Sequence, residues 1–191
     1  MKEIWDILRE TAQSSRETDR RMQETDRRMQ ETDKRIRDLD KQIADLTGSW
    51  GKFVESMVEP AVVRLFRGRG IEIEGTHQRV KKRRDGDEME VDILGINKEW
   101  VVAVEVKTTL KVEDVVEHQE RLDRFKEFFH EYADRKVLGA VAGMRMEEGA
   151  DRYAYRRGFF VLAQSEDGFT IVNHGESVIM LNDETFRPRT W

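Results

Sequence analysis

A seven-residue repeat in the first quarter of the chain constrains the fold more than any other feature. From Glu17 to Ala44 the sequence reads ETDRRMQ, ETDRRMQ, ETDKRIR and DLDKQIA, with no Gly or Pro. With Met22 as heptad position a, the seam consists of Met22, Met29, Ile36 and Ile43 at a, and Thr18, Thr25, Thr32, Leu39 and Leu46 at d. Heptad spacing over several repeats is typical of a left-handed coiled coil. We expect residues 1–47 to form a coiled-coil stalk; the alternative is a single solvated helix held by pairs such as Glu24 with Arg28.

The charges beside this seam predict how two copies would associate. Position g holds Arg21, Arg28 and Arg35, and position e holds Asp19, Asp26, Asp33 and Asp40. In a parallel pair each g residue faces the following e residue of the other helix, so Arg meets Asp, whereas an antiparallel pair opposes like charges. The pattern predicts self-association as a parallel homodimer or higher oligomer.

Composition limits the remaining possibilities. The 191 residues suffice for one domain, residues 48–191, besides the stalk. The absence of Cys excludes disulfides, Cys-based zinc sites and a thiol nucleophile. No apolar run is long enough for a membrane span, so we expect no membrane and a cytoplasmic location. The net charge of −5 gives no general nucleic-acid signal, and a polyanion would need a local patch such as Lys81–Arg84.

The pattern after Gly48 predicts an α/β domain with a mixed sheet covered by helices. Gly48-Ser49 is a predicted hinge or helix break, and helices are expected at 50–67, 113–132 and 149–157. Strands are expected at Ile71–Glu74, Gln78–Arg83, Met89–Gly95, Trp100–Leu110, Lys136–Ala142 and Phe159–Ala163, with edge strands at Phe169–Asn173 and Val178–Leu181.

Two of these strands carry charges where a sheet usually buries apolar side chains. Glu105 and Lys107 are two residues apart and so project from one face of their strand. A two-residue hairpin loop at Asn97-Lys98 would place Asp92 diagonal to Glu105, and a four-residue loop, 97–100, would place it opposite. Both alternatives put the two carboxylates on one face. The other face is predicted to be apolar, with Val91, Ile93, Val102, Val104 and Val106.

Clustered carboxylates beside a lysine favour metal chemistry over a surface salt bridge, which is the alternative. Buried ionised groups cost several kcal/mol unless they meet a partner, a metal or water. Oxygen ligands are those that Mg²⁺ or Mn²⁺ prefers, and such an ion can hold a phosphate oxygen and activate water. Lys107 could position that water or neutralise the transition state.

Asp92, separated by twelve intervening residues from Glu105-Val106-Lys107 and preceded by a helix bearing Glu55, resembles the PD-(D/E)XK nuclease superfamily. The resemblance implies a restriction-endonuclease-like αβββαβ core over residues 50–163. It also implies that Asp92, Glu105, the backbone carbonyl of Val106 and Glu55 bind the metal, and that Lys107 serves the nucleophilic water. The Pro of the family motif is replaced by Val91. With its heptad stalk, the chain looks like a group of uncharacterised prokaryotic proteins that have an N-terminal coiled coil.

Gln119, with neighbouring His118, is a further candidate, because it falls between Val115 and Leu122 on the helix after Lys107. Related nucleases sometimes place a Gln there, and simple helix packing is the alternative. Together these features predict a Mg²⁺-dependent nuclease that hydrolyses DNA and is oligomerised by its stalk. The competing hypothesis is a non-catalytic scaffold or nucleic-acid-binding module on the same fold.

Overall fold

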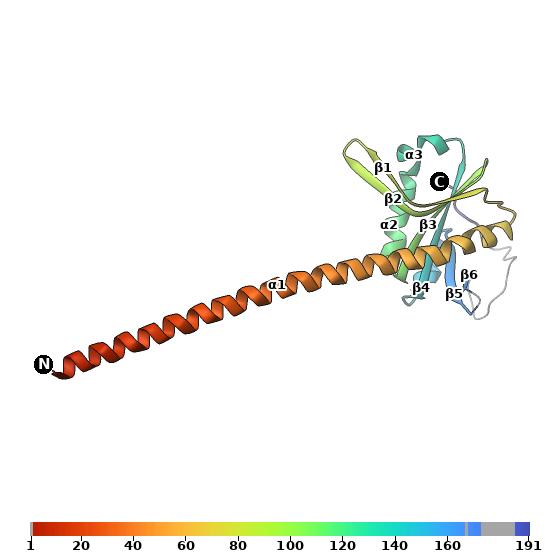
Figure 1. Cartoon of the computed structure of the whole chain (residues 1–191). Coiled ribbons are helices and arrows are strands. Elements are labelled where there is room, and N and C mark those ends of the chain that lie inside the picture. The colour runs from red at the N-terminus through yellow and green to blue at the C-terminus, as the bar shows by residue number, and fades with distance from the viewer. Residues whose placement is uncertain (1, 167, 173–185) are drawn as a thin grey trace. The chain divides into compact units, whose positions relative to one another are not determined.

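A computed structural model describes residues 2–166, 168–172 and 186–191 of the chain (Figure 1). The chain divides into two compact units, Met1–Gly48 and Ser49–Trp191. Helix α1 (Lys2–Arg67) contributes residues to both units, and each unit is described by itself.

The first unit is helical throughout its described length, as the heptad repeat predicts. Arg21 pairs with Glu17 at 2.6 Å and Arg28 pairs with Glu24 at 2.7 Å, both within one helix. The Thr hydroxyls at heptad position d donate hydrogen bonds to the carbonyl four residues earlier, as Thr25 does to Arg21 at 2.8 Å. The larger apolar residues of the seam are all exposed, so this unit presents an uncovered apolar stripe: Met22, Met29, Ile36, Leu39, Ile43 and Leu46.

The prediction of a helix break at Gly48-Ser49 is wrong, because the backbone stays helical through both residues. Gly inside a helix costs only about 1 kcal/mol relative to Ala, which is too little to end a helix of 66 residues. The predicted stop after Arg67 is confirmed. Gly70 adopts φ +78°, a conformation that favours glycine, and the Ile71 N–H donates to the Phe66 carbonyl at 3.0 Å.

The second unit contains one mixed six-stranded sheet in the order β1-β2-β3-β4-β5-β6 (Figure 1). Strands β1 to β3 are antiparallel, β3, β4 and β5 are parallel, and β6 is antiparallel to β5. The strands are β1 (Gly75–Arg84), β2 (Asp87–Ile96), β3 (Trp100–Leu110), β4 (Lys136–Met146), β5 (Phe160–Ser165) and β6 (Gly168–Ile171). The helices after β3 are α2 (Val112–Asp123), α3 (Phe125–Phe128), the 3-10 turn η1 (His130–Tyr132) and α4 (Ala150–Arg156).

Each face of the sheet is covered by a helix and has its own core. On one face, Val58 and Val62 of α1 pack with Val104 and Phe160. On the other face, Val115 of α2 and the stacked rings of Phe125 and Phe129 pack with strand residues. Because β3 and β4 lie in the middle of the sheet, their apolar residues are buried on both sides. The charged end of β3 is therefore held by a rigid, two-sided framework.

Several predicted boundaries need correction. Residues 71–74 form no strand; this segment carries Ile73 into the core, and its first sheet bond is from the Glu74 N–H to the Ile96 carbonyl. The helix predicted over 113–132 is divided into α2, α3 and η1. The last turn of α2 tightens at Arg124, whose N–H donates to the Arg121 carbonyl three residues earlier. The predicted edge strand Phe169–Asn173 corresponds to β6, which ends at Ile171, while Asn173 and Val178–Leu181 lie outside the described residues.

Within the described part of the chain, no helix combines the length and apolar character needed to cross a membrane.

Candidate active site

The hairpin between β2 and β3 has the register of the four-residue loop. Ile96 pairs with Val101, Leu94 with Ala103 and Ile93 with Val104. The same register sets Asp92 opposite Glu105. The backbone pairing of β2 with β3 ends at Ile93. Beyond it, the Asp92 side chain bonds to β3 instead, since its Oδ2 accepts a hydrogen bond from the Val106 N–H at 2.8 Å. Asp92 is thus fixed to the β3 backbone beside Glu105.

Strand β2 is irregular at Asp92. Pairing with β1 passes from Gln78–Ile93 to Val80–Val91 and omits Arg79 and Asp92. Arg79 has φ +52°, which is uncommon for a residue other than glycine. Ile93 packs on the α1 face as predicted, but Val91 packs on the α2 face. The prediction for Val91 is therefore wrong, because strict alternation reverses where β1 and β2 lose their pairing.

Glu105 is the most constrained charge in the site, with only 3% of its surface exposed. Its Oε1 lies 2.9 Å from Lys107 Nζ, and its Oε2 lies 2.6 Å from Arg121 Nη2. Burial acts to raise the pKa of Glu105, but its interactions with His118, Arg121 and Lys107 outweigh it, and the pKa lies below its usual value. Glu105 is therefore ionised in the folded protein.

Asp92 and Lys107 respond to the same neighbourhood in opposite ways. Burial, and then the negative charge of Glu105, raise the pKa of Asp92 to about 6, while the hydrogen bond from Val106 opposes the shift. Burial acts to lower the pKa of Lys107, but its contacts with Glu105 and Asp114 outweigh it and the pKa is raised. Lys107 is consequently a cation at neutral pH, suited to stabilising negative charge rather than accepting a proton.

Glu55 approaches the site from the buried side of α1. It is 4% exposed, and its Oε2 lies 3.1 Å from Arg79 Nε. Burial raises the pKa of Glu55, and Arg79 opposes that shift. The negative charge of Glu55 also contributes to the raised pKa of Asp92. Arg79 thus joins Glu55 to the irregular part of the β1–β2 pair.

Helix α2 contacts Glu105 through His118, the neighbour of Gln119, and through Arg121, which the sequence did not single out. His118 and Arg121, rather than Gln119, reach Glu105; Gln119 is half-buried on the same helix. His118 is buried, its Nε2 lies 3.2 Å from the Ala103 carbonyl, and burial lowers its pKa to about 4. The signal available was helical spacing, since Val115, His118 and Leu122 share one face. Arg79 gave no signal, because its role depends on its backbone conformation.

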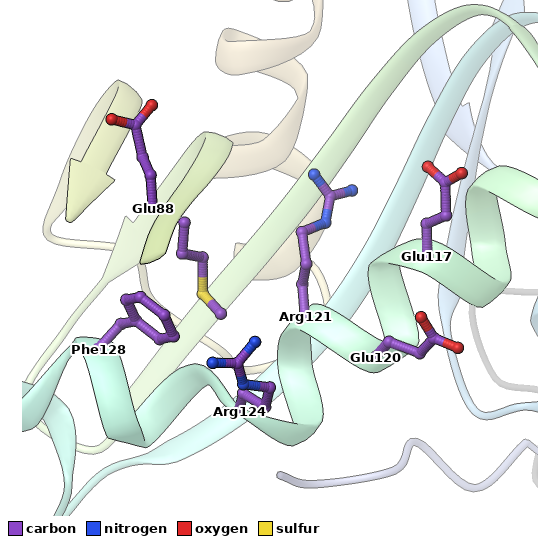
Figure 2. Close-up of a pocket in the computed structure, with 7 residues that line it drawn as sticks. Glu88, Glu117, Glu120, Arg121, Arg124 and Phe128 are labelled. Atoms are coloured by element: carbon purple, nitrogen blue, oxygen red, sulfur yellow. The ribbon is translucent and has the colours of Figure 1, made fainter. Parts of the chain in front are cut away.

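Arg121 also lines a pocket of about 380 Å³ between the start of β2 and α2 (Figure 2). Figure 2 shows Glu117, Glu120 and Arg121 projecting from α2, Arg124 from the junction between α2 and α3, Glu88 from β2 and Phe128 from α3. Arg124 is paired with Asp87 at 2.8 Å. Three carboxylates around two arginines make this pocket a poor match for a phosphate group.

The basic run at the tip of the β1–β2 hairpin is largely neutralised by ion pairs. Lys81 pairs with Glu90, Lys82 with Glu131 and Arg83 with Glu88. These ion pairs within the protein reduce the unpaired positive charge that the run could offer to a polyanion.

The donor atoms are of the kind that a divalent cation prefers. The buried atoms Glu55 Oε2 and Glu105 Oε2 have ion-pair neighbours but no hydrogen-bond donor in suitable geometry. A buried Glu105 oxygen without a hydrogen-bond donor and the raised pKa of Asp92 fit a cation held by Asp92 and Glu105. In the described part of the chain, however, no group of three or more Asp, Glu, His or Cys side chains is gathered tightly enough to hold a metal ion.

No protein-family model and no curated protein matches this sequence. Among solved structures, AF1548, a protein of unknown function, is 19% identical with a TM-score of 0.38, over 56% of this chain and 58% of that chain. A repair endonuclease from Pyrococcus abyssi is 26% identical with a TM-score of 0.34, over 55% and 44%. The EndoMS–dsDNA2 complex is 23% identical with a TM-score of 0.34, over 49% and 39%. This chain spans about half the length of these structures.

With TM-scores this low, the description of the fold rests on the strand order and register of this chain. Its elements α1, β1, β2, β3, α2 and β4 follow the αβββαβ order, with an antiparallel β1–β2–β3 meander and a parallel β3–β4 pair. The second unit has a restriction-endonuclease-like fold, as the resemblance to PD-(D/E)XK nucleases predicted.

Proposed function

We propose that this chain is a Mg²⁺- or Mn²⁺-dependent phosphodiesterase that cleaves DNA. The observation that supports this most is the hairpin register, which sets Asp92 opposite Glu105 with Lys107 beside it. Asp92, Glu105 and the Val106 carbonyl would hold the ion, and Glu55 would complete its shell. When bound, the ion would hold a phosphate oxygen and lower the pKa of a water molecule.

The protein's own residues supply the remaining chemistry in this proposal. The Lys107 ammonium, kept protonated by Glu105 and Asp114, would neutralise charge that develops on the phosphate. Arg121 is a positioning residue, since it keeps Glu105 ionised and oriented at 2.6 Å. Gln119 stays a candidate for contact with the site from α2.

One observation favours a second function, a non-catalytic scaffold or nucleic-acid-binding module. Each of the two buried glutamates already has an arginine beside it, Arg79 for Glu55 and Arg121 for Glu105. A protein that kept this fold without its chemistry could use such arginines as permanent counter-ions.

Cleavage assays with Asp92→Asn separate the two functions. Single-stranded, duplex and branched DNA are incubated with the full chain in Mg²⁺, in Mn²⁺ and in EDTA. Asp85→Asn is the matched control, because Asp85 lies in the β1–β2 turn with 89% of its side chain exposed, at a positive φ that Asn tolerates. The proposal predicts metal-dependent cleavage that Asp92→Asn abolishes and Asp85→Asn retains. Cleavage unaffected by Asp92→Asn would remove the proposed site, and no cleavage of any substrate would favour the scaffold.

We also propose that the stalk joins chains as a parallel homodimer or higher oligomer. The support is the uncovered apolar stripe of α1 and the Arg-to-Asp pairing of positions g and e. Light scattering tests this, and a monomeric mass would contradict it.

A further inference from the structure

The exposed large apolar residues of the second unit include an aromatic pair near its start. Trp50 is 46% exposed and Phe53 is 50% exposed, and their ring centroids lie 5.5 Å apart. Both belong to α1, whose next residues Val54 and Val58 are buried in the core of the domain. Two neighbouring aromatic side chains exposed beside a buried stripe of the same helix indicate a surface for contact with another molecule.

The heptad count identifies this surface with the seam of the stalk. Continuing the stalk register without insertion or deletion, Trp50 falls at position a, Phe53 at d and Met57 at a. The backbone is helical across Gly48 and Ser49, so the register is not interrupted there. The next seam positions are Pro60 at d and Arg64 at a, which end the apolar pattern. Because Met57 is partly buried against the domain core, Trp50 and Phe53 are the last exposed apolar positions of the seam.

The two faces of this helix segment are used differently. At about 100° of rotation per residue, Trp50 lies about 40° and Phe53 about 100° around the helix from Val54, on the side away from Val58 and Val62. One face can pack on the sheet while the other stays available to another helix. The domain core takes up Met57 of the seam but leaves Trp50 and Phe53 exposed.

We infer that a second copy of this chain covers Trp50 and Phe53, so that the coiled-coil interface extends past the stalk into the nuclease-like domain. This inference rests on the self-association proposed above. The seam improves toward the domain, from Met and Thr near Met22 to a final run of large residues: Ile36, Leu39, Ile43, Leu46, Trp50 and Phe53. Three apolar a/d pairs in succession form a stronger interface than the weak Thr positions before them.

One member of the candidate site, Glu55, lies on the same helix segment. Glu55 follows Phe53 by two residues and faces the domain interior. A parallel seam through Phe53 would hold the two Glu55 residues, and the two candidate sites, at the same level along the interface. The partner of this surface is thus an identical chain, and its effect is to fix two sites as a pair.

Single-cysteine variants test the extent of the seam, because the natural chain has no Cys. A disulfide needs Cβ atoms about 4 Å apart, which in a parallel coiled coil is met only by equivalent residues facing each other. Leu46→Cys reports on the stalk, Phe53→Cys on the proposed extension, and Lys52→Cys, at an exposed position c, is the control. Circular dichroism checks that each full-length variant is folded.

We expect Leu46→Cys and Phe53→Cys to form disulfide dimers on mild oxidation while Lys52→Cys stays largely uncrosslinked. Replacing both Trp50 and Phe53 by Ala should raise the dissociation constant at least about tenfold, whereas Lys52→Ala leaves it unchanged. Cross-linking at Leu46 without cross-linking at Phe53 would overturn the extension and leave the stalk dimer intact. A monomer with no cross-linking anywhere would overturn the self-association itself, whatever the result of the cleavage assay.

Discussion

Asp92→Asn should stabilise the protein at neutral pH. Burial and the neighbouring Glu105 hold the pKa of Asp92 at about 6, against an ordinary value of 3.8. An acid whose pKa is higher folded than unfolded weakens the folded state once it ionises, here by about 3 kcal/mol above pH 7. Asn keeps an oxygen that can accept the Val106 N–H and carries no charge. The variant should therefore gain up to about 3 kcal/mol in free energy of unfolding.

The pH dependence gives this prediction its sign. Between the unfolded pKa of 3.8 and the folded pKa of about 6, the native protein binds more protons than the unfolded chain, so wild-type stability falls as pH rises through this window. The advantage of Asp92→Asn should be largest at pH 7.5, about half as large at pH 5, and absent well below pH 4. Urea denaturation in EDTA at each pH measures it, with Asp85→Asn as control. An equal or lower stability of Asp92→Asn at pH 7.5, or a difference independent of pH, would refute the reasoning.

Other predictions concern the supports of the site and the packing around it. Arg121→Met should cost about 2 kcal/mol of unfolding free energy, because it removes a counter-ion of the buried Glu105, and Arg124→Met, at an exposed pair, should cost little in the same denaturant titration. Gly139→Ala should cost about 1–3 kcal/mol, since its Cβ would lie 2.6 Å from Phe159 and 2.7 Å from Leu122. Gly48→Ala meets no atom within 4 Å and should instead raise stability by up to about 1 kcal/mol in thermal unfolding followed by circular dichroism. Mn²⁺ should raise the melting temperature of the wild type and not that of Asp92→Asn, with reversal by EDTA; equal shifts in both proteins would argue against Asp92 as a ligand.

Periodicity was sufficient to predict most of the architecture. The heptads of α1, the alternation in β3 and the apolar run of β4 each depend on local spacing, and the mixed sheet followed from their order. The predicted strand at residues 71–74 was wrong because Ile71 and Ile73 alternate with polar residues as in a strand, whereas Ile73 is buried in the core formed with α1 and the sheet. Helix α2 ends just before Arg124, although the apolar spacing continues beyond it. Apolar spacing alone does not show where one helix ends and the next begins.

The site was only partly readable for a related reason. The alternation of side chains along the strands predicted Asp92, Glu105 and Lys107 on one face for both a two-residue and a four-residue hairpin loop. Only the structure selects the register that sets Asp92 opposite Glu105. Arg121 and His118 reach Glu105 because α2 packs across β3, which is tertiary information. Val91 lies on the face opposite to the predicted one, next to the interrupted β1–β2 pairing at Arg79. The positive φ of Arg79 could not be predicted from its residue type.

The central claim is that the Asp92–Glu105–Lys107 cluster performs metal-dependent DNA cleavage. Single-turnover cleavage by Lys107→Met, measured beside Mn²⁺ binding by calorimetry, tests it most directly, because Lys107 is the member proposed to act on charge and not on the metal. We predict that Mn²⁺ binding is retained while the cleavage rate falls about 100-fold or more. Cleavage by Lys107→Met at the wild-type rate would contradict the account.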